Sequence, residues 1–135
     1  MPSFGIGIDR VLIHRIATAF ERWGYRFAHR VLGPGELEVF DQRVRAHPRQ
    51  GLHYLAKRFA AKEAFAKAMG CGLRSPMFMP RLDILNDAYG KPVAHAHGDL
   101  KQWLTDRGLT AHISLTDEQD AAMAIVMLEA DQANR

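Results

Sequence analysis

Residues 52–69 constrain the fold of this chain more than any other segment, because they have the composition of a long, stable helix. Alanine, leucine, lysine and glutamate dominate the segment, and Gly70 follows as a helix stop signal. The apolar residues recur on one helical face, yet Glu63 falls on that face, four residues after Phe59. A half-buried carboxylate needs a cation or a metal ion beside it to stay charged. The alternative is an ordinary surface pair of Glu63 with Lys67, one helical turn away.

Length and composition indicate a single domain over residues 1–135. Apolar residues make up 47% of the chain, which is ordinary for a globular protein. The single cysteine excludes an internal disulfide and fits a reducing compartment. We find no secretory signal pattern, and the longest apolar run, over residues 121–128, is too short to cross a bilayer. We therefore expect a cytoplasmic protein that does not span a membrane.

Basic side chains are concentrated near the N-terminus, although the formal net charge is only +3. Two acidic residues oppose five arginines in the first thirty positions: Arg10, Arg15, Arg22, Arg26 and Arg30. Such a surface attracts an acidic protein or a phosphorylated ligand. No nucleic-acid-binding motif accompanies the arginines, so nucleic acid is not an expected partner. For any single arginine, a solvated surface position is the competing explanation.

The remaining pattern predicts an α+β domain in which an antiparallel sheet packs against the long helix. Strand-forming residues occupy four segments: 4–13, 82–85, 111–115 and 121–129. A hairpin turn over residues 86–92 leads into a further strand that starts near Pro92. Shorter helices are expected over three segments: 15–23, 36–45 and 98–107. Residues 47–51 are expected to form a linker and residues 70–80 a loop.

Three separated motifs carry a resemblance to a known family. Residues 5–9 read Gly-Ile-Gly-Ile-Asp and end a strand on a carboxylate. Residues 58–67 supply a second carboxylate and two lysines. Residues 112–118 place a histidine on a late strand. Together with residues 86–92, they resemble the holo-acyl-carrier-protein synthases, the short bacterial class of 4'-phosphopantetheinyl transferases. The resemblance runs nearly end to end and implies the fold of that family.

The resemblance also implies an activity and a metal. Members of the family transfer 4'-phosphopantetheine from coenzyme A to a serine of apo acyl carrier protein, which implies fatty acid biosynthesis and lipid metabolism as the context. The reaction needs Mg2+ and releases adenosine 3',5'-bisphosphate. Asp9 and Glu63 match the two metal carboxylates of the family, and Mg2+ prefers such oxygen ligands. Without the metal the two carboxylates would repel, so metal binding should depend on pH.

Further site residues are implied in the same way. Glu63, Lys67 and His112 are the expected catalytic residues, and Lys67 would lie near the pyrophosphate. The expected coenzyme-binding residues are Arg58, Lys62, Gly70, Gly72, Lys91, Pro92 and His112. The general base is left open between Glu63, a metal-bound water and His112. Gly70 could instead simply cap the C-terminus of the helix. His112 could instead be a strand histidine that forms a hydrogen bond with a neighbouring residue.

The resemblance also implies an acceptor surface and an assembly. The family docks an acidic helix of the carrier protein on arginines of its first helix, so Arg15, Arg22 and Arg26 are the expected acceptor-binding residues. Longer members of the superfamily contain two related halves, whereas this chain has the length of one half. The resemblance therefore implies a homotrimer with active sites at the subunit interfaces.

Three residues depart from the pattern of the family, and two rival functions stay open. Arg10 and Leu12 follow the metal aspartate at positions where an aliphatic and an acidic residue are usual, and Cys71 stands between the two glycines. The same carboxylates would also suit a Mg2+-dependent phosphohydrolase. A basic binding module without catalysis is the second alternative, but it leaves Glu63 on an apolar face unexplained.

Overall fold

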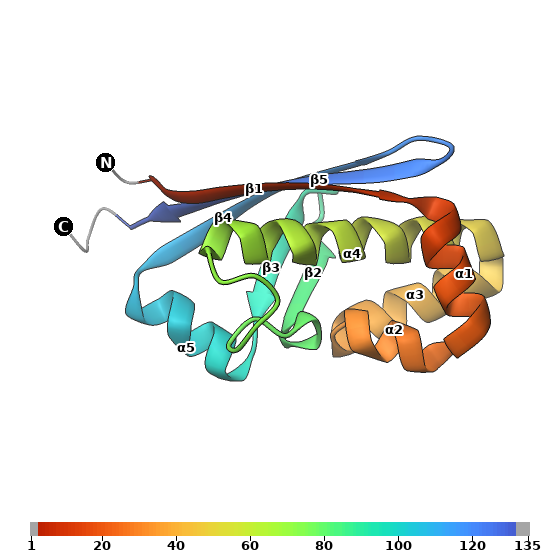
Figure 1. The fold of residues 1–135 in the computed structure, drawn as a ribbon, viewed down its shortest axis with the longest axis horizontal. Helices are drawn as coiled ribbons and strands as arrows, with labels where there is room; N and C mark the ends of the chain where they lie inside the picture. Colours follow the sequence, from red (N-terminus) through yellow and green to blue (C-terminus); the bar gives the residue numbers. More distant parts are fainter. Residues whose placement is uncertain (1–2, 132–135) are drawn as a thin grey trace.

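A three-stranded antiparallel sheet and one long helix form the centre of the molecule (Figure 1). The computed structural model describes residues 3–131. The strand order is β1–β5–β4, and a separate hairpin pairs β2 with β3. The elements are β1 (Ser3–Leu12), α1 (Ile13–Trp23), α2 (Tyr25–Val31), α3 (Pro34–Ala46), α4 (Pro48–Met69), the 3-10 turn η1 (Met79–Arg81), β2 (Leu82–Asn86), β3 (Pro92–Ala96), α5 (Gly98–Asp106), β4 (Leu109–Asp117) and β5 (Ala121–Ala130). The expected α+β class, with an antiparallel sheet on a long helix, is confirmed.

Helix α4 is longer than the sequence analysis expected. It begins at Pro48, so the linker expected over residues 47–51 is wrong. Proline suits the first turn of a helix, because its missing N–H has no partner there in any case. The expected stop at Gly70 is confirmed, with the glycine in the left-handed region at φ 84°. No helix in residues 3–131 is long and apolar enough to span a membrane.

Two glycines bring α4 unusually close to β1. A Cβ atom on Gly5 would overlap the Ala68 carbonyl oxygen, and one on Gly7 would overlap the Ala64 carbonyl oxygen. Both glycines lie on the side of β1 that faces α4, where the helix presents small alanine side chains. Asp9 is the next residue on that side, because alternate residues of a strand share a face. The glycine contacts therefore hold Asp9 against the middle of α4.

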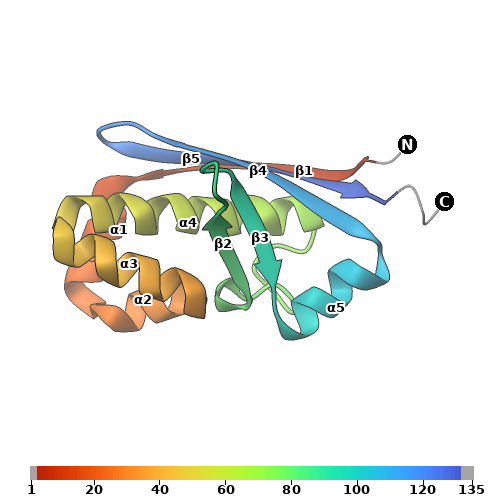
Figure 2. The ribbon, with the colours of Figure 1, turned by 180° about the vertical axis from the view of Figure 1, so that it is seen from behind.

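Helices α1, α2 and α3 gather around the N-terminal half of α4, and the β2–β3 hairpin and α5 lie toward its other end (Figure 1 and Figure 2). Helix α2 was not expected. Gly24, at φ 59°, ends α1 and begins α2, so the glycine separates two helices where the sequence analysis placed only the end of one. The helix has only seven residues, which is too short for apolar periodicity to be recognised in the sequence.

The two faces of the main sheet differ. All five helices of the described part lie on one side of it, and the inner residues of β5 are fully buried there (Figure 1). The other side, which we call the outer face, carries large apolar side chains that remain exposed: Ile6, Ile8, Met123, Ile125 and Met127. Ile6 is 64% exposed, although isoleucine is among the residues most often buried. A contiguous apolar surface of this kind is typical of an interaction site.

Candidate active site

The two carboxylates singled out in the sequence lie in one pocket. Asp9 comes from β1 and Glu63 from α4, and both line a pocket of about 340 Å³. Arg15, at the start of α1, lines the same pocket, while Phe27 and Phe59 form an aromatic wall with ring centroids 6.3 Å apart. The close approach of β1 to α4 thus turns two carboxylates from distant parts of the sequence into one acidic site with an arginine beside it.

Lys67 joins this group one helical turn after Glu63. Its ammonium donates to the Ile8 carbonyl oxygen at 2.9 Å and to Asp9 Oδ1 at 3.2 Å. The side chain remains 55% exposed, so it can exchange these contacts for others. Asp9, Glu63 and Lys67, which the sequence analysis expected at the reaction centre, are therefore brought together.

The neighbouring charges of Asp9 and Lys67 affect the pKa of Glu63. Partial burial raises the pKa of Glu63, the negative charge of Asp9 raises it further, and Lys67 opposes both effects. Two carboxylates that repel each other in one open pocket fit a hard divalent cation such as Mg2+, which takes oxygen ligands and keeps several sites for water or phosphate. The oxygen donors of the pocket therefore suit the expected metal, and the assignment of Asp9 and Glu63 as the residues that would hold it stays a prediction.

Beside the carboxylate pocket lies a second, basic one. It has a volume of about 310 Å³ and is lined by Trp23, Arg26, Phe27 and Arg30. The guanidinium carbons of Arg22 and Arg26 lie 5.0 and 6.0 Å from the Trp23 ring. Phe27 lines both pockets, so they share a wall. Trp23 was not predicted as a site residue; its only signal in the sequence is an aromatic residue with arginines nearby on both sides.

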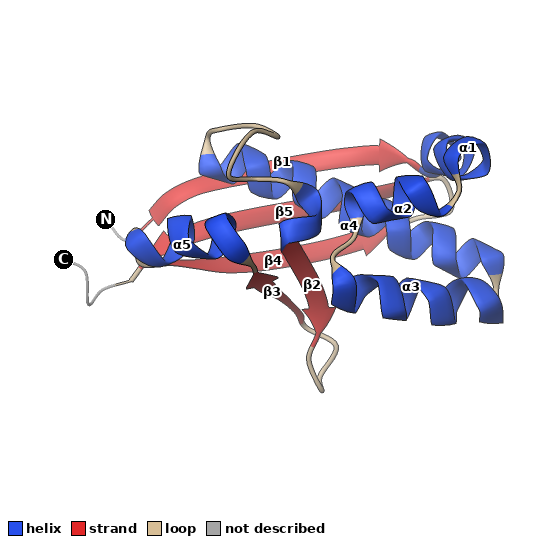
Figure 3. Cartoon of the chain, turned by 90° about the horizontal axis from the view of Figure 1, so that it is seen from below, coloured by secondary structure: helices blue, strands red, loops and turns tan. Residues whose placement is uncertain are grey.

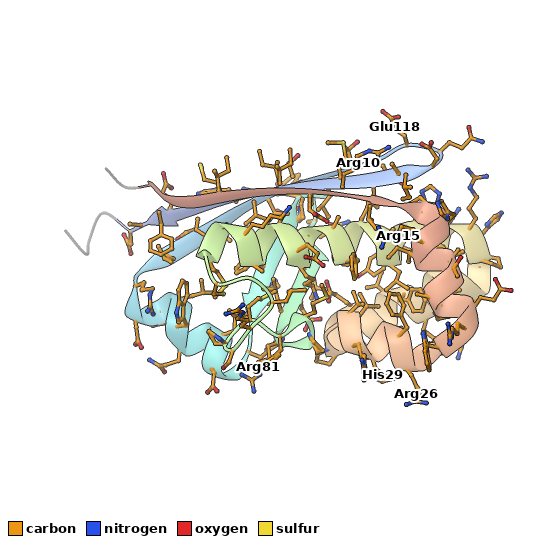
Figure 4. The ribbon with its side chains drawn as sticks, viewed as in Figure 1. Arg10, Arg15, Arg26, His29, Arg81 and Glu118 are labelled. Carbon is orange, nitrogen blue, oxygen red and sulfur yellow. The ribbon has the colours of Figure 1, made fainter. Side chains whose placement is uncertain are left out.

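The side chains of this region point in different directions. Arg26 and His29 extend from α2 into solvent, while Arg15 lies close to the junction of α1 and α4 (Figure 4). Arg10 extends from the outer face of the sheet, as does Glu118 at the β4–β5 turn (Figure 4). Arg15 thus belongs to the carboxylate pocket, whereas Arg22 and Arg26 belong to the surface around Trp23.

Two residues expected at the coenzyme are buried instead. Lys62 is fully buried, and its ammonium donates to Glu36 Oε1 at 2.7 Å, to the Val31 carbonyl oxygen at 2.8 Å and to the Met79 carbonyl oxygen at 2.9 Å. Arg58 is 2% exposed, and its Nη2 donates to the Ile84 carbonyl oxygen at 3.0 Å. Because neither head group reaches the carboxylate pocket, neither is part of the site assembled by one chain.

Burial shifts the pKa values of Lys62 and Glu36, which form an ion pair. It raises the pKa of Glu36 and lowers the pKa of Lys62, and the attraction between the two opposes both shifts. Such a pair is undetectable in the sequence, because its partners are far apart in the chain.

The remaining expected residues are divided between the two edges of the sheet. Gly70 and Gly72 follow the end of α4, which packs on β1, whereas Lys91 and Pro92 belong to the β2–β3 hairpin beside β4 (Figure 3). His112 is on β4 and on the outer face, where Glu129 Oε1 lies 3.1 Å from its Nε2. One chain therefore does not bring Lys91, Pro92 and His112 to Asp9 and Glu63.

Comparison with known proteins identifies the family. The family model of the 4'-phosphopantetheinyl transferase superfamily matches residues 5–126. A holo-(acyl-carrier-protein) synthase of Variovorax paradoxus is 51% identical over 126 residues, which cover 93% of this chain and 97% of the relative.

Solved structures agree with this match. The crystal structure of the holo-(acyl-carrier-protein) synthase from Neisseria meningitidis has a TM-score of 0.86 at 41% identity, covering 94% of this chain and 98% of that one. A holo-(acyl-carrier-protein) synthase from Bacillus anthracis, solved in complex with CoA (3',5'-ADP), has a TM-score of 0.78 at 28% identity, covering 96% of this chain and 98% of that one. The chain therefore belongs to the 4'-phosphopantetheinyl transferase superfamily and, within it, to the holo-(acyl-carrier-protein) synthases.

Proposed function

We propose that the protein transfers 4'-phosphopantetheine from coenzyme A to a serine of apo acyl carrier protein in a Mg2+-dependent reaction, in the cytoplasm and for fatty acid biosynthesis. The observation that carries the proposal is the shared pocket of Asp9 and Glu63, with the ammonium of Lys67 3.2 Å from Asp9 Oδ1. Family membership supports it, as does the relative from Bacillus anthracis solved with CoA (3',5'-ADP).

In the proposed reaction, the serine oxygen of the carrier forms a bond to the β-phosphorus of coenzyme A. The bond from that phosphorus to the bridging oxygen breaks, and adenosine 3',5'-bisphosphate leaves. When bound by Asp9 and Glu63, Mg2+ supplies charge neutralisation at the phosphoryl oxygens. Lys67, already poised beside Asp9, can turn its exposed ammonium to the pyrophosphate.

The serine proton needs an acceptor. Of the three candidates, Glu63 lines the pocket of one chain and a metal-bound water would be held there, whereas His112 lies on the other face of the sheet. His112 would reach that pocket only from a neighbouring copy.

The arginine surface around Trp23 supports an acidic protein as the acceptor. Arg22 and Arg26 hold positive charge over an aromatic ring that is 50% exposed, and Arg15 continues the charge into the carboxylate pocket. A carrier helix with carboxylates would be attracted to this surface and oriented by it. The contact would bring the acceptor serine to the shared wall of the two pockets.

We propose a homotrimer with active sites at the subunit interfaces, as the family resemblance implies, and two observations support association between copies. The outer face is a contiguous apolar surface, and burying it between copies would remove that surface from water. The expected coenzyme residues Lys91, Pro92 and His112 lie away from Asp9 in one chain, so a second copy is needed to complete the expected set. We propose that the copies associate through the outer face.

The test is transfer to an apo carrier protein, read as the intact mass of the carrier. With coenzyme A and Mg2+, we expect the carrier to gain one phosphopantetheine, and we expect a chelator to prevent it. Glu63→Gln should abolish the gain, while Glu38→Gln, an exposed glutamate on α3, should leave it intact. Hydrolysis of a phosphate ester without any carrier would instead favour a phosphohydrolase. Stable carrier binding without transfer, in a folded and metal-loaded protein, would favour a binding module.

A further inference from the structure

The ammonium of Lys62 connects three separate elements to α4. It donates to the Val31 carbonyl oxygen at the end of α2, to Glu36 on α3 and to the Met79 carbonyl oxygen of η1. An ammonium has three protons, so these contacts use all of its donors. Its side chain is fully buried, which excludes water as a substitute partner. The residue is thus committed to holding these elements together.

The contact of Lys62 with the Val31 carbonyl oxygen stabilises the C-terminal end of α2. This helix has only seven residues, and no side chain caps its N-terminus. Short helices are marginal without tertiary support. A positive charge on the last carbonyl groups of a helix satisfies them and interacts favourably with the helix dipole. Lys62 supplies that charge from α4.

Glu36 fixes the other side of the same junction. Its Oε1 accepts from the Gly33 backbone N–H and its Oε2 from the Ile84 backbone N–H, both at 2.9 Å. Asp83 Oδ1 in turn accepts from the Glu36 backbone N–H at 2.9 Å. Because all of these groups are buried, the start of α3 and strand β2 are held in one arrangement around the Lys62 ammonium.

The position of Lys62 relates this junction to the site. Glu63 is the next residue of α4, and α2 carries the basic pocket residues Arg26, Phe27 and Arg30. We propose that Lys62 is a positioning residue that sets α2, and with it the acceptor-docking surface, relative to the carboxylate pocket. The kinetic effect expected from this role rests on the proposed function. The positioning role replaces the coenzyme contact that the sequence led us to expect for Lys62.

The test needs a variant that folds. Lys62→Met alone leaves the buried Glu36 carboxylate unpaired, which is strongly destabilising. The double variant Glu36→Gln/Lys62→Met removes both charges and so leaves no unpaired buried charge. Lys57→Met is the matched control: it removes another lysine of α4, whose ammonium lies 3.5 Å from Asp117 Oδ1 and contacts no group of α2.

Two readouts follow. In the double variant, amide hydrogen exchange of residues 25–31 should be at least about tenfold faster, with α5 and the Lys57→Met control unchanged. The KM for the carrier should rise by about fivefold or more, while the KM for coenzyme A stays within about twofold. Unchanged exchange in α2 would overturn the inference. A higher KM for coenzyme A with an unchanged carrier KM would overturn it too, and would place Lys62 at the coenzyme.

Failure of the proposed function gives a different pattern. If the parent protein transfers nothing to any carrier, the kinetic readout disappears for parent and variant alike, and the proposed function fails. Hydrogen exchange then decides the inference, because it reports the attachment of α2 without any turnover. Faster exchange in α2, with α5 unchanged, would support the positioning role, and unchanged exchange in α2 would refute it.

Discussion

The Lys67 ammonium lies 3.2 Å from Asp9 Oδ1 and donates to the carbonyl oxygen of the preceding residue, Ile8. The contact partly neutralises the carboxylate pair before any metal or phosphate arrives. A cation at Asp9 would therefore compete with Lys67, and a pyrophosphate would attract Lys67 away. Lys67 should therefore weaken the binding of the metal ion and strengthen the binding of the pyrophosphate.

Replacing Lys67 by methionine should separate these effects. We expect Lys67→Met to bind Mg2+ more tightly, by about two- to tenfold in the absence of coenzyme, because the competing charge is gone. Coenzyme A should bind at least about tenfold more weakly, since a charge-assisted contact to its phosphates is lost. Calorimetric titration of each ligand checks both signs. Lys101→Met, an exposed lysine on α5, should change neither affinity.

The raised pKa of Glu63 predicts the pH dependence of the metal site. Mg2+ binds the ionised carboxylate, so its affinity should fall as the pH drops through the raised pKa of Glu63. Without metal, folding favours the protonated form, so stability should decline as the pH rises from the ordinary glutamate pKa through the raised one. Glu63→Gln should remove this decline and raise the Tm at neutral pH by a few degrees. Thermal unfolding of the metal-free protein against pH checks it, and Glu38→Gln should follow the parent curve.

The approach of β1 to α4 should tolerate no side chain at Gly7. Gly7→Ala would place a methyl group against the Ala64 carbonyl oxygen, and overpacking of this kind costs about 1–3 kcal/mol. Separation of the strand from the helix would also move Asp9 from Glu63, so Mg2+ affinity should fall. Gly90→Ala is the control, because its Cβ meets open space and only the positive φ is strained, at about 1 kcal/mol. An equal loss of Mg2+ affinity in both variants would contradict the explanation.

Charge reversal on the docking surface should weaken acceptor use selectively. Arg22→Glu should raise the KM for an acidic carrier at low salt by about tenfold or more, and the difference from the parent should shrink as salt screens the charges. Trp23→Ala should raise the same KM with less dependence on salt, because it removes mainly apolar contact. Kinetics at two ionic strengths distinguish the two effects. Arg45→Glu, on the exposed side of α3, should behave as the parent does.

A charge on the outer face should prevent assembly of the protein. Ile6 is 64% exposed in the single chain, so Ile6→Lys should fold normally but remain a monomer in sedimentation experiments. On the proposed arrangement, the monomer should also lose transfer activity. Gln102→Lys, on the exposed surface of α5, is the control and should keep the assembly of the parent. A parent protein that sediments as a monomer and is fully active would rule out the interface.

Local signals in the sequence were sufficient for most of the fold. Alternating strand residues, the alanine-rich helix and the stop at Gly70 all depend on near neighbours in the chain, and the structure confirms them. Helix α2 was missed because its contacts are with distant parts of the chain, among them the Lys62 ammonium, thirty-one residues after Val31. The linker expected over residues 47–51 was wrong because Pro48 begins a helix, a position in which proline stabilises rather than breaks it.

The candidate site was only partly accessible from the sequence. The family resemblance singled out Glu63 and Asp9, and a carboxylate on an apolar helical face had already drawn attention to Glu63. The sequence motif suggested that Asp9 ends a strand, but β1 continues to Leu12. The burial of Lys62 depends on Glu36, on another helix, and no sequence pattern distinguishes that lysine from an exposed one. The location of His112 on the outer face depends on the pairing register of β4 with β5.

The separation of Asp9 and His112 on opposite faces of one sheet has a genetic consequence on the proposed assembly. A cell producing only Asp9→Asn protein, or only His112→Ala protein, would have no intact site. A cell producing both would form mixed assemblies in which one chain supplies the histidine and another the aspartate. Two inactive alleles should then restore growth together, and purified mixtures should regain transfer only after the subunits have exchanged.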